Sequence, residues 1–301
     1  MAINQEYIVG IGELLWDCFP SYRRIGGAPS NFAYHASQFG YKGLVISAIG
    51  HDQNGEDLIE ELEKHNLSYH LERVDLPTGT VSVDMTVMND PQYTINTDVA
   101  WSCIPFTKEL VEIAHQCRAV CYGTLAQYGK ESRQTIGWFL EAVPQNCYKI
   151  YDVNLRENLG VPLYDEETIA SSMSKCNVLK VNIGELDYLA GLFHVANKNE
   201  SVNNKAEAII KMYSNIEILI VTMGTDGSWV FWGKESSFKN TPTVDVVDVV
   251  GAGDSFTGAF IGSLLNGKSI SGAHKTAVIV SAYVCTQPDG MPVMPKGIES
   301  L

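Results

Sequence analysis

The chain has 301 residues, with 35 acidic and 21 basic side chains and a formal net charge of −14. This length suits one large α/β domain, and we expect residues 1–301 to form a single domain. Because the charge is negative and no basic run occurs, composition argues against nucleic acid or an anionic membrane surface as the main partner.

The N-terminal residues lack the basic and apolar regions of a secretory signal, and no apolar run is long enough for a membrane-spanning helix. The seven cysteines include no C-x-x-C pair, and several lie in apolar runs. They are therefore interpreted as reduced core residues. Together these features predict a cytoplasmic protein.

Residues 6–11 predict a short strand that ends at Gly10-Ile-Gly12. A dinucleotide-binding fingerprint is excluded, because Leu15 stands where the third glycine would be and no helix follows at once. The chain instead continues as an extended segment as far as Asp17. An acid near a strand end is a candidate ligand for sugar hydroxyls, or otherwise a solvated turn residue.

A helix is predicted to begin at Pro29 and Ser30 and to end at Gly40, directly after a pair of glycines. Gly26 and Gly27 allow the backbone to approach a ligand closely, although such a pair is more often a plain turn. Asn31 offers both a donor and an acceptor, which the vicinal hydroxyls of a sugar require. Asp17 and Asn31 therefore form a candidate sugar-binding pair.

Residues 80–88 alternate between apolar and polar side chains, and after a turn at 89–91 a returning strand begins with Tyr93. A one-sided hairpin inside an α/β chain is interpreted as a lid, and Tyr93 on it is a candidate contact with the substrate. The alternative is an edge hairpin with no role in binding.

From residue 107 onward, helical and extended patterns alternate, which predicts βα units and a mostly parallel central sheet. The helical patterns cover 111–115, 132–143, 166–173, 184–190 and 206–213, and the extended ones cover 119–121, 149–153, 178–181 and 216–222. Ligands in such sheets bind beyond the carboxyl ends of the strands, so the residues that follow each strand are the candidate site.

Polar residues follow two of these strands. Arg156 can clamp a phosphate through two hydrogen bonds, and Asn154 can bind hydroxyls. Asn182 and Glu185, three residues apart across a helix start, can hold a hydrated Mg²⁺ beside phosphate. Each also has an ordinary explanation, such as a capping residue or a surface ion pair.

A third loop, which carries Thr222, Gly224 and Gly227, offers hydroxyl and amide donors suited to nucleotide phosphates. Alone it is an ordinary glycine turn. All three loops are expected at the same edge of one sheet, and this shared position favours a functional site.

The β-branched residues 241–247 predict a strand, and a helix is predicted to begin near Gly253. Gly251 and Gly253 leave backbone N–H groups bare at this helix start, which suits an anion such as a transferring phosphoryl group. Asp254 would repel that anion unless it takes a proton from an attacking hydroxyl. The alternative is a plain strand–turn–helix in which Asp254 favours the helix start. In the last predicted helix, 272–286, small residues such as Ser281 suit either an adenine ring or helix packing.

Four motifs resemble those of the PfkB (ribokinase-like) carbohydrate kinases along almost the whole chain. The Gly251–Asp254 stretch with Asp248 before it resembles the C-terminal signature, and the stretch from Gly26 to Ala33 resembles the N-terminal one. Asn182-x-x-Glu185 is similar to the family's Mg²⁺ and phosphate motif. The segment from Asp152 to Arg156 is similar to that of fructokinases and 2-keto-3-deoxygluconate kinases.

The resemblance implies a ribokinase-like α/β fold, in which helices flank the sheet and a small β-sheet lid is formed by about 13–25 and 79–103. In this family the lid closes over the sugar and often forms the dimer contact, so a homodimer through the lid is expected. The implied roles are a catalytic base at Asp254, an anion hole at Gly251, Ala252 and Gly253 with Arg156 nearby, Mg²⁺ at Asn182 and Glu185, and a monovalent cation such as K⁺ at Asp248 and Val250.

The expected function is ATP-dependent phosphorylation of a sugar's primary hydroxyl, with fructose as the first candidate. The alternatives are 2-keto-3-deoxygluconate, another sugar or a nucleoside as substrate, and a sugar-sensing protein without activity. Two departures bear on the substrate. The hairpin lacks the Arg-rich segment of many fructokinases, and Ser102 stands where related sequences often have Asp.

Overall fold

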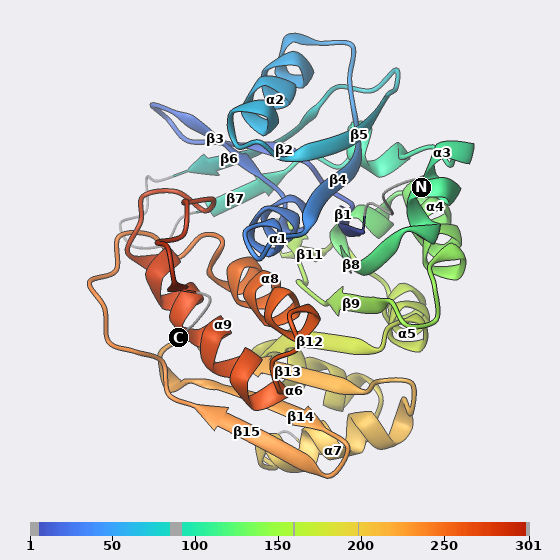
Figure 1. Ribbon diagram of the computed structural model, residues 1–301. Helices are drawn as coiled ribbons and strands as arrows, with labels where there is room; N and C mark the ends of the chain where they lie inside the picture. The colour runs from blue at the N-terminus through green and yellow to red at the C-terminus, as the bar shows by residue number, and fades with distance from the viewer. Residues whose placement is uncertain (1–5, 85–91, 159, 198, 299–301) are drawn as a thin grey trace, which may run out of the picture.

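The computed structural model describes residues 6–84, 92–158, 160–197 and 199–298, and its centre is a nine-stranded sheet (Figure 1). In sheet order the strands are β15 (Glu235–Lys239), β14 (Ser228–Trp232), β13 (Ile218–Thr222), β12 (Val178–Asn182), β9 (Tyr148–Asp152), β8 (Cys117–Gly123), β1 (Tyr7–Ile11), β4 (Lys42–Ile49) and β5 (Ser68–Arg73). Strands β13 to β5 are parallel, and β14 and β15 continue the sheet in antiparallel order. The predicted mostly parallel sheet is confirmed, although no pattern above predicts β5, β14 or β15.

Helices cover both faces of this sheet (Figure 1). One layer contains α1 (Ala28–Ser37), α2 (Gln53–Lys64), α8 (Ala252–Leu265) and α9 (Ile270–Cys285), and the other contains α3 (Lys108–His115), α4 (Lys130–Ala142), α5 (Glu166–Lys175), α6 (Ile183–Leu192) and α7 (Val202–Met212). Short 3₁₀ turns are η1 (Ala100–Cys103), η2 (Leu125–Tyr128) and η3 (Gly224–Asp226). Because both faces are covered, a central strand such as β4 is buried over seven successive residues.

A separate four-stranded sheet lies beside the carboxyl ends of the parallel strands, at the upper left of Figure 1. Its order is β3 (Arg23–Gly26), β2 (Leu15–Cys18), β6 (Gly79–Asp84) and β7 (Gln92–Ile95). The predicted hairpin is therefore present as β6 and β7, while residues 85–91 lie outside the described part. A two-stranded ribbon, β10 (Glu157–Asn158) with β11 (Val161–Pro162), completes the strands.

Helix α1 is held between β1 and α8 by close backbone contacts. A Cβ atom added to Gly10 would lie 1.8 Å from the Pro29 carbonyl oxygen, and one added to Gly258 would lie 2.8 Å from Cβ of His35. Only glycine permits such approach at both places. This packing places the start of α1 beside the start of α8, although the two are more than 200 residues apart in the chain.

The strand predicted for residues 241–247 is wrong. These residues form a loop that crosses from β15 to α8, and Val246 and Val247 are each 61% exposed. The loop contacts the end of α9 through the Val247 N–H, which donates to the Cys285 carbonyl at 2.8 Å. β-Branched residues favour extended backbone, but a strand also needs a neighbouring ladder, and here the chain leaves the sheet.

Two observations concern the predicted absence of a membrane-spanning helix and the predicted reduced cysteines. Over the residues that the structure describes, no helix combines the length and apolar character that membrane crossing requires. All seven cysteines are free thiols, and four of them are buried.

Candidate active site

The glycine loop at the start of α8 leaves backbone donors open. Gly251 has a left-handed backbone with φ of 76°, and a Cβ atom there would lie 2.5 Å from the Gly290 carbonyl oxygen. The Gly251 and Gly253 N–H groups donate to no group in the described residues, whereas that of Ala252 donates to the Val249 carbonyl at 3.3 Å. No side chain caps the helix. Open donors at a helix N-terminus form a site for an anion.

Asp254 lies in the first turn of the same helix and contacts Asn31, one of the predicted sugar-binding residues. Its Oδ2 accepts a hydrogen bond from Asn31 Nδ2 at 2.7 Å. Burial and the nearby Asp152 carboxylate raise the pKa of Asp254 to about 6, while Lys180, Asn31 and Arg156 oppose the shift. The group is therefore mostly ionised at neutral pH and basic enough to accept a proton from a hydroxyl.

Lys180 is a site residue that the sequence reasoning missed. It forms a buried ion pair with Asp152, with 3.0 Å between Nζ and the carboxylate. Its Nζ lies 3.2 Å from where a Cβ atom of Gly253 would stand, so the ammonium lies beside the glycine loop. Burial lowers the pKa of Lys180, but Asp152, Glu185 and Asp254 raise it further, so the side chain stays charged. A lysine inside an otherwise apolar strand was the signal available in the sequence.

Glu13 is a second missed residue. Its side chain is 2% exposed, and one carboxyl oxygen has no hydrogen-bond partner within the described chain. Burial raises the pKa of Glu13 to about 7, and the charges of Arg156 and Asp254 also act on it. A carboxyl group with a spare acceptor is suited to a sugar hydroxyl. The signal in the sequence was an acid between two apolar runs.

The predicted sugar-binding residues come together at the edge of the small sheet. Asp17 lies on β2, and a Cβ atom on Gly26 would lie 2.8 Å from its Oδ2. Gly27 has φ of 118°, and a Cβ atom there would lie 2.2 Å from the Glu13 carbonyl oxygen. The glycine pair thus brings the start of α1 against Asp17 and Glu13. The side chain of Tyr93 lies outside those that the structure describes.

Asn154 and Arg156 follow β9 as predicted. Asn154 has a left-handed backbone with φ of 41°. Arg156 is exposed, and its charge lowers the pKa values of Glu13, Asp17 and Asp254. The guanidinium therefore lies within electrostatic range of the acids from both sides of the site.

Asn182 and Glu185 cap helix α6. The Asn182 side chain accepts from the Glu185 N–H at 2.9 Å, and Glu185 Oε2 accepts from the Asn182 N–H at 2.8 Å. Glu185 Oε1 accepts from the Leu155 N–H at 3.0 Å. A carboxylate has about four acceptor positions, so this set still fits a hydrated Mg²⁺ that is held mainly by nucleotide phosphates. No cluster of three or more metal-ligating side chains occurs in the described residues.

Four of the six predicted nucleotide-binding residues line one cavity of about 390 Å³, and the other two, Asn182 and Glu185, are not among its lining residues. Thr222, Gly224, Gly227 and Ser281 all border it, together with Ala252 and Gly253 of the glycine loop. Val246, Phe256, Val278 and Ala282 supply apolar wall. The cavity therefore joins an apolar chamber to the open helix N-terminus, as a base and its phosphates require.

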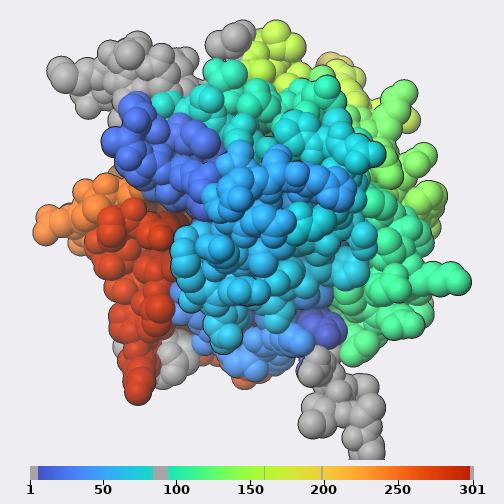
Figure 2. Space-filling view, turned by 90° about the horizontal axis from the view of Figure 1, so that it is seen from above, coloured from blue at the N-terminus to red at the C-terminus, as the bar shows by residue number. Residues whose placement is uncertain are grey.

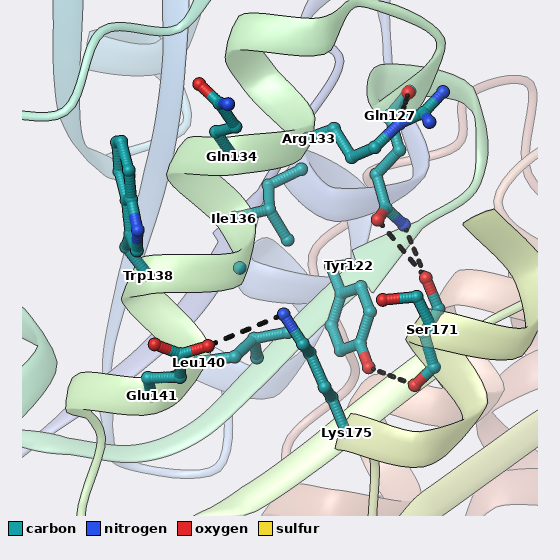
Figure 3. A pocket seen from close by; sticks show the side chains of 12 residues that line it. Tyr122, Gln127, Arg133, Gln134, Ile136, Trp138, Leu140, Glu141, Ser171 and Lys175 are labelled. Atoms are coloured by element: carbon teal, nitrogen blue, oxygen red, sulfur yellow. Dashed lines mark hydrogen bonds and ion pairs between the residues drawn. The ribbon is translucent and has the colours of Figure 1, made fainter. Parts of the chain in front are cut away.

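A second hollow, of about 250 Å³, lies between α4 and α5 in the other helix layer (Figure 3). Several of its polar side chains are paired with one another. Gln127 bonds Ser172, the Tyr122 hydroxyl donates to the Ser172 carbonyl, and Lys175 lies 3.6 Å from Glu141. We assign this hollow no function.

A family model described as pfkB family carbohydrate kinase matches residues 21–297. The chain belongs to this family. It is an ATP-dependent carbohydrate kinase, as its motifs predict. Probable fructokinase-3 of Arabidopsis thaliana is 26% identical over 318 residues, which cover 98% of this chain and 90% of the relative.

Solved structures confirm the ribokinase-like α/β fold. A 2-dehydro-3-deoxygluconokinase of Thermotoga maritima matches with a TM-score of 0.82 and 20% identity, over 99% of this chain and 98% of the other. A fructokinase double mutant of Vibrio cholerae, with fructose, ADP and potassium ion bound, matches with a TM-score of 0.79 and 21% identity, over 98% and 97%.

Proposed function

We propose that this kinase transfers the γ-phosphoryl group of ATP to the primary hydroxyl of fructose. The observation that carries the proposal is the hydrogen bond between Asn31 and Asp254, which joins the sugar side to the start of α8. A base at this point lies between a bound hydroxyl and the open glycine N–H groups. The Arabidopsis relative, named as a fructokinase, supports fructose.

Asp254 takes the proton from the attacking hydroxyl as that oxygen approaches the phosphorus atom in line. The Gly251 and Gly253 N–H groups donate to the phosphoryl oxygens, and the positive charges of Lys180 and Arg156 attract the negatively charged phosphates. Asn182 and Glu185 would hold Mg²⁺ through bound water, and the ion would supply positive charge that offsets the charge of the nucleotide phosphates. Asp17, Glu13 and Asn154 orient the sugar hydroxyls.

The small sheet serves as the lid in this proposal, over about 13–25 and 79–103. It stands beside the carboxyl edge, where closure would exclude water from the phosphoryl group. An aromatic stack at the tip of the β2–β3 hairpin, in which the exposed Tyr22 packs on the half-buried Phe19 at 4.5 Å between ring centroids, supports a second copy of the chain as the lid's partner. Light scattering of Tyr22→Ser against wild type tests this homodimer.

The second candidate substrate is 2-keto-3-deoxygluconate. An acidic sugar needs a cation near the lid, and both Arg24 and Arg156 act electrostatically on Asp17. The Thermotoga maritima structure bears the name of that activity. In this case Arg156 would bind the carboxylate of the substrate.

The deciding experiment measures ADP release with MgATP and each of fructose, ribose, 2-keto-3-deoxygluconate and adenosine. The Asp254→Asn protein, purified in parallel, corrects for contaminating kinases. Preference for fructose supports the proposal. Preference for the keto acid would indicate that Arg156 binds the carboxylate of the substrate. Sugar binding without turnover would instead indicate a sensor and contradict the catalytic proposal.

A further inference from the structure

Arg24, on strand β3 of the small sheet, is paired with the loop that precedes α8. Its Nη1 donates to Asp248 Oδ2, although the two residues are 224 positions apart. The side chains are only 11% and 22% exposed. The other oxygen, Asp248 Oδ1, accepts from the Val250 N–H at 3.0 Å. Both oxygens of the Asp248 carboxylate are therefore engaged within the protein.

Two backbone carbonyls close to this loop also accept hydrogen bonds within the protein. The Gly290 carbonyl accepts from His35 Nε2 at 2.8 Å, and burial lowers the pKa of His35 to about 4, so the ring is neutral. The Cys285 carbonyl accepts from the N–H groups of Val247 and Asp248 at 2.8 and 3.3 Å. A potassium ion at Asp248 would have to displace the guanidinium from the same oxygen. The residues present do not fit the predicted monovalent-cation site.

We propose that the Arg24 guanidinium takes the place of a monovalent cation at the Asp248 loop, so that this kinase works without potassium. The inference rests on the proposed function and adds to it a positioning residue, Arg24, and independence from potassium. A tethered cation occupies the position at any salt composition, whereas a bound ion must be taken from solution.

The same side chain links the two halves of the site. Arg24 stands opposite Asp17 across the β2–β3 pair, so it lies between the sugar-side acid and the acid of the phosphate loop. Its charge lowers the pKa of Asp17, while that of Asp248 raises it and burial raises it most. Figure 2 shows the dark-blue β2–β3 hairpin next to the red C-terminal part of the chain. Arg24 therefore fixes the lid sheet against the loop that positions the α8 donors.

The neighbouring Arg23 is a matched control. It lies on the same strand, but its guanidinium points to α2, where it pairs with Asp57 and donates to Asn54 Oδ1 at 2.7 Å. It also covers the Trp16 ring at 4.2 Å. Arg23→Gln removes an equal charge from the lid sheet without touching Asp248.

The experiment compares wild type, Arg24→Gln and Arg23→Gln in KCl, NaCl and choline chloride at equal ionic strength. It records melting temperature without substrates and initial rates with MgATP and the best sugar. In wild type and Arg23→Gln, we expect rates that agree within about twofold among the salts and melting temperatures without a K⁺-specific rise. In Arg24→Gln, we expect kcat/KM to fall about tenfold in choline chloride, with about threefold recovery and a higher melting temperature in KCl.

Two results would overturn the inference. One is strong activation of wild type by K⁺ together with a K⁺-specific rise in its melting temperature, which would show that the ion displaces Arg24. The other is an Arg24→Gln protein that matches wild type in every salt. If no sugar turns over and the proposed function fails, the melting temperatures alone still decide whether K⁺ binds.

Discussion

Two helix starts lie at the same edge of the sheet, and their backbone donors differ. At α6, the Asn182 side chain and the Glu185 side chain each accept from the other's N–H, so the cap is complete within the protein. At α8, Gly251 has no side chain to act as a cap, and the Gly251 and Gly253 N–H groups have no partner in the described chain. The start of α6 is therefore capped by its own side chains, whereas the N–H groups at the start of α8 are open to a ligand.

The difference shows that two helix N-termini at one sheet edge can have different roles, one in stability and the other in ligand binding. A capping box stabilises its helix and positions Glu185 beside Lys180 and Asp152. An uncapped glycine loop gives up that stability, and its unsatisfied donors become available to phosphoryl oxygens. Substitutions at the two helix starts test this contrast.

Asp254→Asn is expected to lower kcat by about 1,000-fold, because the variant cannot accept the hydroxyl proton. Sugar binding should persist, since an Asn at this position can still accept from Asn31. Steady-state kinetics and calorimetric sugar titration measure the two effects. Turnover near the wild-type rate would remove Asp254 from the role of base.

Gly251→Ala is expected to cost about 3 kcal/mol of unfolding free energy and most of the activity, because the left-handed backbone and the Gly290 carbonyl both oppose a Cβ atom. Gly267 is the control. It has φ of 80° at the other end of α8, with nothing within 4 Å of an added Cβ. Gly267→Ala should cost about 1 kcal/mol and leave kinetics unchanged. Equal effects of the two changes in urea unfolding would show that the loop is not tightly packed.

The activity is expected to fall as the pH is lowered, because Asp254 becomes protonated and can no longer accept a proton. With its pKa raised to about 6, kcat/KM is expected to drop about fivefold from pH 6 to pH 5, because the ionised fraction falls from about one half to about one eleventh. Folding favours the protonated form, because the folded pKa lies above the unfolded one, so the protein loses stability as the pH rises from about 4 to about 6 and the carboxyl group ionises. Asp254→Asn should therefore be more stable than wild type at pH 8, by roughly 1–3 kcal/mol, with a smaller gain at pH 5. A pH-independent difference in melting temperature between the two proteins would contradict this assignment.

Asn182→Ala should cost about 1 kcal/mol of stability, as the loss of an N-cap does, and should raise the Mg²⁺ concentration needed for half-maximal rate. Ser269 caps the start of α9 by accepting from the Gly272 N–H at 3.2 Å, at the far end of the helix from Asp248. Ser269→Ala should show a similar stability loss and no change in Mg²⁺ dependence. If both variants respond alike to Mg²⁺, Asn182 is a cap and nothing more.

Much of the fold and part of the site could be predicted from short-range patterns. The alternation of helical and extended segments predicts a parallel sheet, and the residues that follow its strands lie at one edge by geometry. Thr222, Gly224 and Gly227, at and after the end of β13, line one cavity for this reason. The failure at 241–247 shows the limit, since local β propensity cannot report whether a ladder partner exists.

Lys180, Glu13 and Arg24 could not be placed by such patterns, because their roles depend on burial and on partners far away in the chain. A charge in an apolar segment shows that a partner is needed, but only packing shows which one. The family, the sheet edge that binds ligands and the glycine loop with its acid could all be predicted from the sequence, because these features depend on local backbone chemistry. The tertiary structure decided that Asn31 meets Asp254, that Lys180 supports the loop and that Arg24 binds Asp248, because each contact joins elements that only the packing of α1 and the small sheet brings together.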